Sequence, residues 1–253
     1  MARAGLVLHK KKKLYDHARF VFAFQQVKEG RNDRKYRSDR LRQRREDVGI
    51  FSLNAHFDKS FGNGQHLYYG GQWDYNKVNS TGIEQNIMTD EARVIASRYP
   101  DGGSQTHQAG IYFSYKKNFS KLPLSLLTGI RFSLSSLSSN FADTSFYHLP
   151  YTHIKINNQS VTGNTGLVYR PGQWQFRLNL SSGFRAPNLD DVAKIFDSEP
   201  GNVVVPNENL KPETLYNTDF GIKKSFGQKA DVEMTLFYSY LQHAMVRRDS
   251  LLN

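Results

Sequence analysis

Apolar and polar residues alternate with a period of two along most of this 253-residue chain. Between residues 51 and 58, Phe51, Leu53 and Phe57 lie on one side of an extended backbone, and polar residues such as Asn54 lie on the other. The same alternation recurs in residues 66–75, 174–185 and 231–240. Successive side chains of a β-strand point to opposite faces, so the pattern predicts strands with one apolar and one polar face.

Nine strands are predicted, centred near residues 22, 53, 71, 111, 130, 165, 179, 219 and 236. The predicted apolar face carries Phe51, Leu53, Phe57, Trp73, Phe176, Leu178, Met234 and Leu236. The predicted polar face carries Asn54, Gln72, Arg177, Asn179 and Arg185.

The connections between these strands alternate in length. Short connections carry the glycine or proline that tight turns require, at 60–65, 118–123, 169–173 and 225–230. Long polar connections are expected at roughly 27–47, 79–105, 140–157 and 186–212. In an up-and-down meander this order places every long loop on one rim, which is typical of a transmembrane β-barrel.

A soluble β-sandwich, with an adhesive or carbohydrate-binding role, is the alternative, because its strands also have two unlike faces. Two features favour the barrel. Glycines accompany the polar face, and tyrosine and tryptophan gather near the strand ends of the apolar face, as at a membrane interface. These residues are Gly70, Gly110, Gly129 and Gly183 on the one face, and Trp73, Tyr75, Tyr115, Trp174, Tyr238 and Tyr240 on the other. The predicted fold is an all-β, up-and-down antiparallel transmembrane β-barrel fragment of about nine strands.

Composition narrows the function. A chain with 38% hydrophobic residues and no long apolar run has no predicted membrane helix, and the absence of cysteine excludes disulfides and thiolate chemistry. The net charge of +11 suggests anionic partners. Residues 28–47 hold nine Lys and Arg against five Asp and Glu, which suits an anionic chelate or anionic lipid headgroups equally. The run Lys10–Lys13 is interpreted as a solvated turn and not as a nucleic-acid site.

Residues 183–191 (GFRAPNLDD), 197–207 (DSEPGNVVVPN) and 209–213 (NLKPE) resemble the TonB-dependent receptors of Gram-negative outer membranes. The resemblance extends over nearly the whole chain. It implies energy-coupled uptake of a large nutrient, such as a ferric siderophore, haem or cobalamin, through a barrel closed by a plug. The matching motif residues are Phe184, Arg185, Ala186, Pro187, Asn207, Asn209, Leu210 and Pro212.

Most of this motif is interpreted as architecture for a large loop. Pro187 ends a strand because it cannot donate to the ladder. Arg177 and Arg185 face the predicted lumen and are candidate ligand-binding residues. For Arg185, pairing with a carboxylate such as Asp190 is the preferred hypothesis.

The segments 184–187 and 207–210 resemble the FRAP box and the NPNL box of the family's haem receptors, which carry an axial histidine between the two boxes. Here Glu208 replaces the proline and no histidine lies between the boxes. His148 and His153, in another long segment, are candidate ligand-binding residues, but no metal ligand or cofactor is assigned. An enzyme is not expected, because the sequence has neither a phosphate-binding glycine loop nor a nucleophile elbow.

Residues 1–253 are therefore expected to be part of a receptor barrel domain, without the plug. Barrels of this family close with roughly 22 strands. The chain alone is expected neither to close nor to transport, because open strand edges are costly in hydrocarbon. The expected partners are outer-membrane lipid, a large anionic or metal-chelate ligand and, only through the plug, the TonB energy-transducing protein. Once completed, the barrel is expected in the Gram-negative outer membrane.

Overall fold

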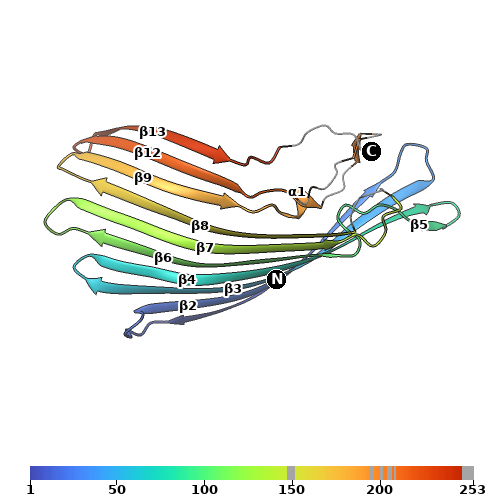
Figure 1. Ribbon diagram of the computed structural model, residues 1–253, viewed down its shortest axis with the longest axis horizontal. Helices are drawn as coiled ribbons and strands as arrows, with labels where there is room; N and C mark the ends of the chain where they lie inside the picture. Colours follow the sequence, from blue (N-terminus) through green and yellow to red (C-terminus); the bar gives the residue numbers. More distant parts are fainter. Residues whose placement is uncertain (147–151, 194–196, 200–201, 204–206, 208, 247–253) are drawn as a thin grey trace.

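The computed structural model describes residues 1–146, 152–193, 197–199, 202–203, 207 and 209–246. Within them the chain forms a single curved antiparallel sheet (Figure 1). Ten strands follow one another in sequence order across it: β1 (Ala2–Leu8), β2 (His17–Asp33), β3 (Arg40–Gly62), β4 (Gln65–Asn86), β6 (Ser104–Asn118), β7 (Leu124–Asn140), β8 (His153–Tyr169), β9 (Trp174–Arg185), β12 (Glu213–Phe226) and β13 (Ala230–Gln242).

The remaining elements lie along one rim. Strand β5 (Ala92–Val94) pairs with β4, while β10 (Asp197–Glu199) and β11 (Asn202–Val203) form a separate hairpin. Helix α1 (Leu189–Val192) follows β9. No helix among the described residues is long and apolar enough to cross a membrane.

All nine predicted strands are present in an up-and-down sheet. Strand β1 was missed, because small residues at Ala2, Ala4 and Gly5 give it little contrast between its faces. The described strands form one meandering layer and not the two packed sheets of the sandwich alternative.

The strand register confirms the two predicted faces. Leu53 of β3 is paired with Phe22 of β2 and Trp73 of β4, and Phe220 of β12 is paired with Leu178 of β9. Antiparallel partners point to the same side, so the predicted apolar residues share one face, here called the outer face. The predicted polar residues share the opposite, inner face.

Aromatic rings on the outer face form two rows across β2, β3, β4 and β6. One row runs from Phe51 through Tyr75 to His107, with ring centroids 6.3 and 4.7 Å apart. The other pairs Phe57 with Tyr69 at 5.0 Å. Phe51 and Phe57 are separated by about 20 Å of strand at 3.3 Å per residue, which places both rows within an apolar band of about 25 Å once strand tilt is included.

The inner face is lined by polar side chains that lie along the wall. A Cβ atom at Gly110 would collide with the guanidinium of Arg131, so this glycine makes room for the arginine. Asn179 donates to Asp219 at 2.9 Å, and Ser52 donates to Asp74 at 2.6 Å. Gly70 and Gly129 likewise make room for Tyr112 and Asn164, whereas Gly183 lies beside Leu215.

Three of the four long loops are shorter than the sequence predicted, the first two most of all. Residues 27–33 belong to β2, residues 40–47 to β3 and residues 79–86 to β4. These strands therefore continue well past the aromatic row of Phe51, Tyr75 and His107 (Figure 1). Outside a bilayer both faces of a strand are wet, so the apolar alternation vanishes although the backbone ladder continues. We call residues 26–33 of β2, 40–48 of β3 and 78–86 of β4 the strand extension.

The described parts of the connections 34–39, 87–103, 141–152 and 186–212 lie on one rim, the loop rim, and the connections 9–16, 63–64, 119–123, 170–173 and 227–229 lie on the other, the turn rim (Figure 1).

Replacing Ile111 with Arg in a complete receptor containing these strands tests the outer face. Ile111 lies on the outer face and its side chain is 54% exposed, so the arginine would be buried in hydrocarbon and folding into a bilayer should weaken by about 2–4 kcal/mol. Gln108→Arg on the inner face of the same strand is the control and should cost less than about 1 kcal/mol. Equal losses in folding titrations would contradict the assignment of the two faces.

Candidate functional site

The base of the 186–212 connection is held by one arginine between two carboxylates. Arg185, at the end of β9, is the register partner of Glu213, at the start of β12. One of its terminal nitrogens donates to both Asp191 oxygens at 2.8 Å, and the other donates to Glu213 at 3.1 Å. The Met245 amide also donates to Glu213 at 2.8 Å, and this bond, followed by that from Arg185, lowers the pKa of Glu213.

Helix α1 begins with a capping box. The Asn188 side chain accepts from the Asp191 amide at 3.1 Å, and the Asp191 carboxylate accepts from the Asn188 amide at 3.0 Å. Asp191 therefore joins the helix start to Arg185.

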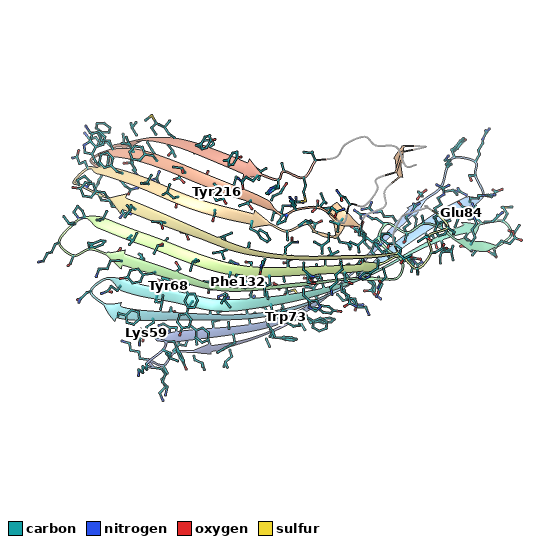
Figure 2. All side chains as sticks on the ribbon, viewed as in Figure 1. Lys59, Tyr68, Trp73, Glu84, Phe132 and Tyr216 are labelled. Atoms are coloured by element: carbon teal, nitrogen blue, oxygen red, sulfur yellow. The ribbon has the colours of Figure 1, made fainter. Side chains whose placement is uncertain are left out.

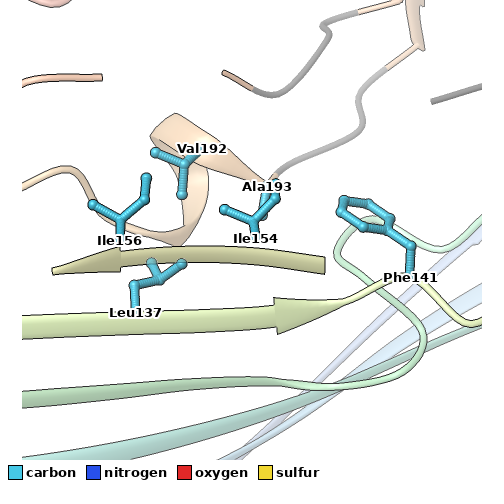
Figure 3. Close-up of a cluster of buried hydrophobic side chains, with 6 residues drawn as sticks. All are labelled: Leu137, Phe141, Ile154, Ile156, Val192 and Ala193. Atoms are coloured by element: carbon cyan, nitrogen blue, oxygen red, sulfur yellow. The ribbon is translucent and has the colours of Figure 1, made fainter. Parts of the chain in front are cut away.

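The far side of α1 packs on the inner face of the sheet (Figure 3). Val192 and Ala193 are fully buried against Leu137 of β7 and Ile154 and Ile156 of β8. Leu137, Ile154 and Ile156 are apolar although they lie on the polar inner face, because the helix covers them. Leu189 and Leu210 pack against the same cluster, so the 183–191 and 209–213 motif segments meet at one hydrophobic contact.

A second connection is tied to the same helix. The Tyr99 hydroxyl donates to Asp190 at 2.8 Å, across 91 positions of sequence. Burial, together with this hydrogen bond, raises the pKa of Tyr99 to about 12. Tyr99 therefore stays a neutral donor at physiological pH, and the 87–103 connection is held against the 186–212 connection.

Arginines line the inner face of the strand extension. Glu84, only 4% exposed, accepts from Arg42 at 3.1 Å, from Arg40 at 3.3 Å and from Arg93 of β5 at 2.9 Å (Figure 2). The hydrogen bond from Arg42, with those from the other arginines, lowers the pKa of Glu84. Arg44 donates to the Ala96 carbonyl at 3.2 Å. Three guanidinium groups around one carboxylate leave a local excess of positive charge facing the loop-rim interior.

Glu46 lies lower on the same wall and differs from Glu84. It is 3% exposed, and neither carboxylate oxygen has a hydrogen-bond partner among the described residues. Burial, with repulsion from Glu29, raises the pKa of Glu46. Arg98, which forms an ion pair with Glu29 at 3.6 Å, partly offsets this effect.

A cavity of about 220 Å³ opens beside β4 and β5 at the loop rim. Its apolar wall includes Ile83, Val94 and Phe141, and Asp101 and Asp143 lie at its border.

The predicted ligand-binding residues are placed as follows. Arg185 pairs with a carboxylate as expected, but the partner is Asp191 and not Asp190, because the capping box turns Asp191 toward the strand end. Arg177 lies on the inner face and forms an ion pair with Glu233. His153, at the start of β8, bonds through Nδ1 to the Asn140 side chain at 2.6 Å. His148 lies outside the described residues.

The motif residues act mainly at the base of the connection. Pro187 is buried, and Phe184, Ala186 and Pro212 are partly buried near the strand ends. The Asn207 side chain accepts from the Asn209 amide at 2.9 Å. Sequence reasoning missed Tyr99, for which no local pattern exists. It also missed the inward orientation of Arg40, Arg42 and Arg44, which their spacing of two could have shown. Among the described residues, no group of three or more His, Asp or Glu side chains is placed to hold a metal ion.

Replacing Arg185 with Ala should release α1. The variant loses the bonds to Asp191 and Glu213, so the amides of Val192 and Ala193 should exchange hydrogen about tenfold faster, as expected for the loss of a charged hydrogen bond. Arg170→Ala, at an exposed turn of the opposite rim, is the control. Unchanged exchange in the Arg185 variant would refute the anchoring role.

Glu46 should make the strand extension less stable as pH rises. A carboxyl whose folded pKa is raised carries no penalty below its ordinary value near 4.5; the penalty grows as pH climbs to the raised value and is complete above it. Exchange at the Tyr99 amide, which bonds the Ser80 hydroxyl at 3.4 Å, should therefore be slower at pH 5 than at neutral pH after correction for intrinsic rates. In Glu46→Gln this pH dependence should shrink; if it persists unchanged, Glu46 is not its source.

Comparisons with known proteins agree with this architecture. The family model described as TonB dependent receptor-like, beta-barrel matches residues 7–251. No curated protein sequence matches the chain at a significant level.

Among solved structures, the chain is similar to the copper transporter OprC, with a TM-score of 0.73 and 13% identity over 95% of this chain and 38% of that one. It is similar to the Serratia marcescens hemophore receptor HasR, determined as a double mutant with its hemophore HasA and heme, with a TM-score of 0.66 and 11% identity over 94% and 39% of the two chains. It is also similar to the ferric yersiniabactin uptake receptor FyuA of Yersinia pestis, with a TM-score of 0.56 and 13% identity over 89% of this chain and 33% of that one.

At these identities the likeness shows the fold alone, and the chain spans less than two fifths of each of these structures. The matched family consists of non-enzymatic transport receptors typical of Gram-negative outer membranes. The chain belongs to the TonB-dependent receptor family, and its eleven-stranded sheet corresponds to part of that family's β-barrel.

Proposed function

We propose that residues 1–253 form part of the barrel wall and ligand vestibule of an outer-membrane receptor that imports a large, anionic metal chelate. The observation that carries the proposal is the inward-facing arginine wall around Glu84, opposite a loop anchored on the inner face. Ferric siderophores and haem are substrates of this chemical kind, and cobalamin is a less charged member of the same size class. The names of the matched structures cover copper, heme and ferric yersiniabactin, which supports metal uptake in general and not one substrate.

The orientation of the 28–47 arginines distinguishes the two partners that the sequence left open. Arg31, Arg40, Arg42 and Arg44 belong to the inner face, while Lys28 and Arg45 belong to the outer face. Lys28 is partly neutralised by Asp47, 3.7 Å away. Four of the six Lys and Arg side chains on these strand segments therefore face a ligand in the vestibule, where Arg31 and Arg44 are paired with Glu29 and Asp33, and two face lipid headgroups outside.

In this proposal Arg185 supports the vestibule through its ion pairs, whereas Arg177 lies on the inner face near the turn-rim end of β9. His153 stays a candidate ligand-binding residue. Arg185 acts by fixing α1, so its contribution to binding is positional. Arg177 is held by Glu233 on the inner wall. His148 keeps its status as a sequence-based candidate.

Energy coupling is assigned to a plug domain. The inner face is polar and wet, which suits contact with a plug, and TonB would act through that plug and not through these strands. The 253 residues supply wall and vestibule, in the Gram-negative outer membrane where the family typically resides.

Removing inner-face charge in the complete receptor tests the proposal. Arg40→Gln with Arg42→Gln should slow capture of an anionic ferric chelate about tenfold at low ionic strength and leave a neutral chelate unaffected, because charge-lined clefts raise association rates by at least that factor. Stopped-flow binding measures the rates, and the difference should shrink as salt screens the field.

Lys28→Gln with Arg45→Gln removes the same charge from the outer face and should leave capture unchanged. Arg42→Gln with Glu84→Gln removes an ion pair without changing net charge and separates lost charge from lost packing. Equal slowing by the inner-face and outer-face variants would reject the vestibule.

A further inference from the structure

The chain's net positive charge is concentrated on the turn rim, opposite the basic 28–47 segment. The turns and strand ends of this rim contain twelve Lys and Arg against three Asp and no Glu, so they account for most of the +11 net charge. The rest of the chain is nearly neutral. The rim segments are residues 9–17, 58–66, 116–124, 169–174 and 223–231.

Two of these lysines lie on the outer face beside aromatic rings. Lys224 of β12 has its ammonium 4.7 Å from the Trp174 ring and 5.1 Å from the Phe226 ring. Lys117 of β6 lies 6.0 Å from the Phe119 ring. Such rings and lysines meet at the depth where lipid chains give way to headgroups.

The four-lysine turn is held in place at the same level. Lys59 of β3 donates to the Lys12 carbonyl at 2.6 Å and to Asp16 at 2.8 Å. The Lys12 amide donates to the Tyr15 carbonyl at 2.7 Å, which closes the turn. Lys10–Lys13 are all exposed, and the backbone that presents them is fixed.

We infer that the turn rim binds the phosphate headgroups of anionic phospholipids in the leaflet that surrounds it. The inference rests on the proposed function, because it requires the outer face to lie in a bilayer. The complementary charge, the fixed turn and the aromatic rings at headgroup depth all favour a lipid. A lysine near an anionic membrane surface contributes several-fold to binding, and the turn rim presents many. A nucleic acid is disfavoured, because Lys117 and Lys224 lie beside the apolar band.

The test uses the complete receptor in nanodiscs of equal phosphatidylethanolamine and phosphatidylglycerol, followed by gentle extraction and mass spectrometry of the retained lipid. The rim variant carries Lys11→Gln, Lys13→Gln, Lys117→Gln and Lys224→Gln. The control removes four exposed charges from or near the loop rim, with Lys28→Gln, Arg34→Gln, Lys35→Gln and Lys77→Gln.

Wild type and control should retain phosphatidylglycerol over phosphatidylethanolamine at a molar ratio of at least about ten, and the rim variant should retain the two lipids near the equal ratio of the bilayer. Equal retention by all three proteins, or equal loss in the control, would overturn the inference. Displacement of the lipid by millimolar inorganic phosphate would indicate a free-phosphate site and also overturn it. Heat-modifiable migration is measured in parallel: if wild type fails to insert, the proposed function fails, whereas insertion without lipid preference rejects only the lipid site.

Discussion

The backbone hydrogen-bond ladder between neighbouring antiparallel strands is the interaction on which the rest of this structure depends. Within hydrocarbon no water can satisfy a free amide or carbonyl, so each spanning strand must be paired along its length. The ladder fixes the register, and the register places Phe22, Leu53 and Trp73 side by side on the outer face. The opposite face is then free to carry polar groups such as Asn179 and Asp219.

Beyond the apolar band the same hydrogen-bond ladder continues, but both faces of the strands meet water. The strand extension is wet on both faces, and its stability comes from pairing and from ion pairs such as those of Glu84 with Arg40 and Arg42. Elsewhere on the sheet the inner face is covered by protein, as α1 covers Leu137 of β7 and Ile154 of β8. One sheet therefore carries an apolar outer face, a charged strand extension and an anchored loop.

The strands were predictable where one face meets lipid and the other meets water, because the spacing of Phe51, Leu53 and Phe57 by itself indicates an apolar face. The strand extension was not, since alternation of apolar residues disappears when both faces are wet. The sequence predicted that Arg185 forms an ion pair with a carboxylate, but not which one. The choice between the adjacent Asp190 and Asp191 depends on where α1 begins. The contact between Tyr99 and Asp190 depends on the meeting of two distant loops, which no local pattern encodes.

Site-directed spin labelling along β6 tests the central claim most directly, because none of residues 1–253 is a cysteine that would compete for the label. In the complete receptor in a bilayer, labels at consecutive positions from residue 107 to 115 should alternate in accessibility. Odd positions should favour oxygen, which partitions into lipid, and even positions should favour a water-soluble nickel complex. Accessibility to both reagents that rises and falls together, or shows no period of two, would contradict a sheet with one lipid-facing and one wet face.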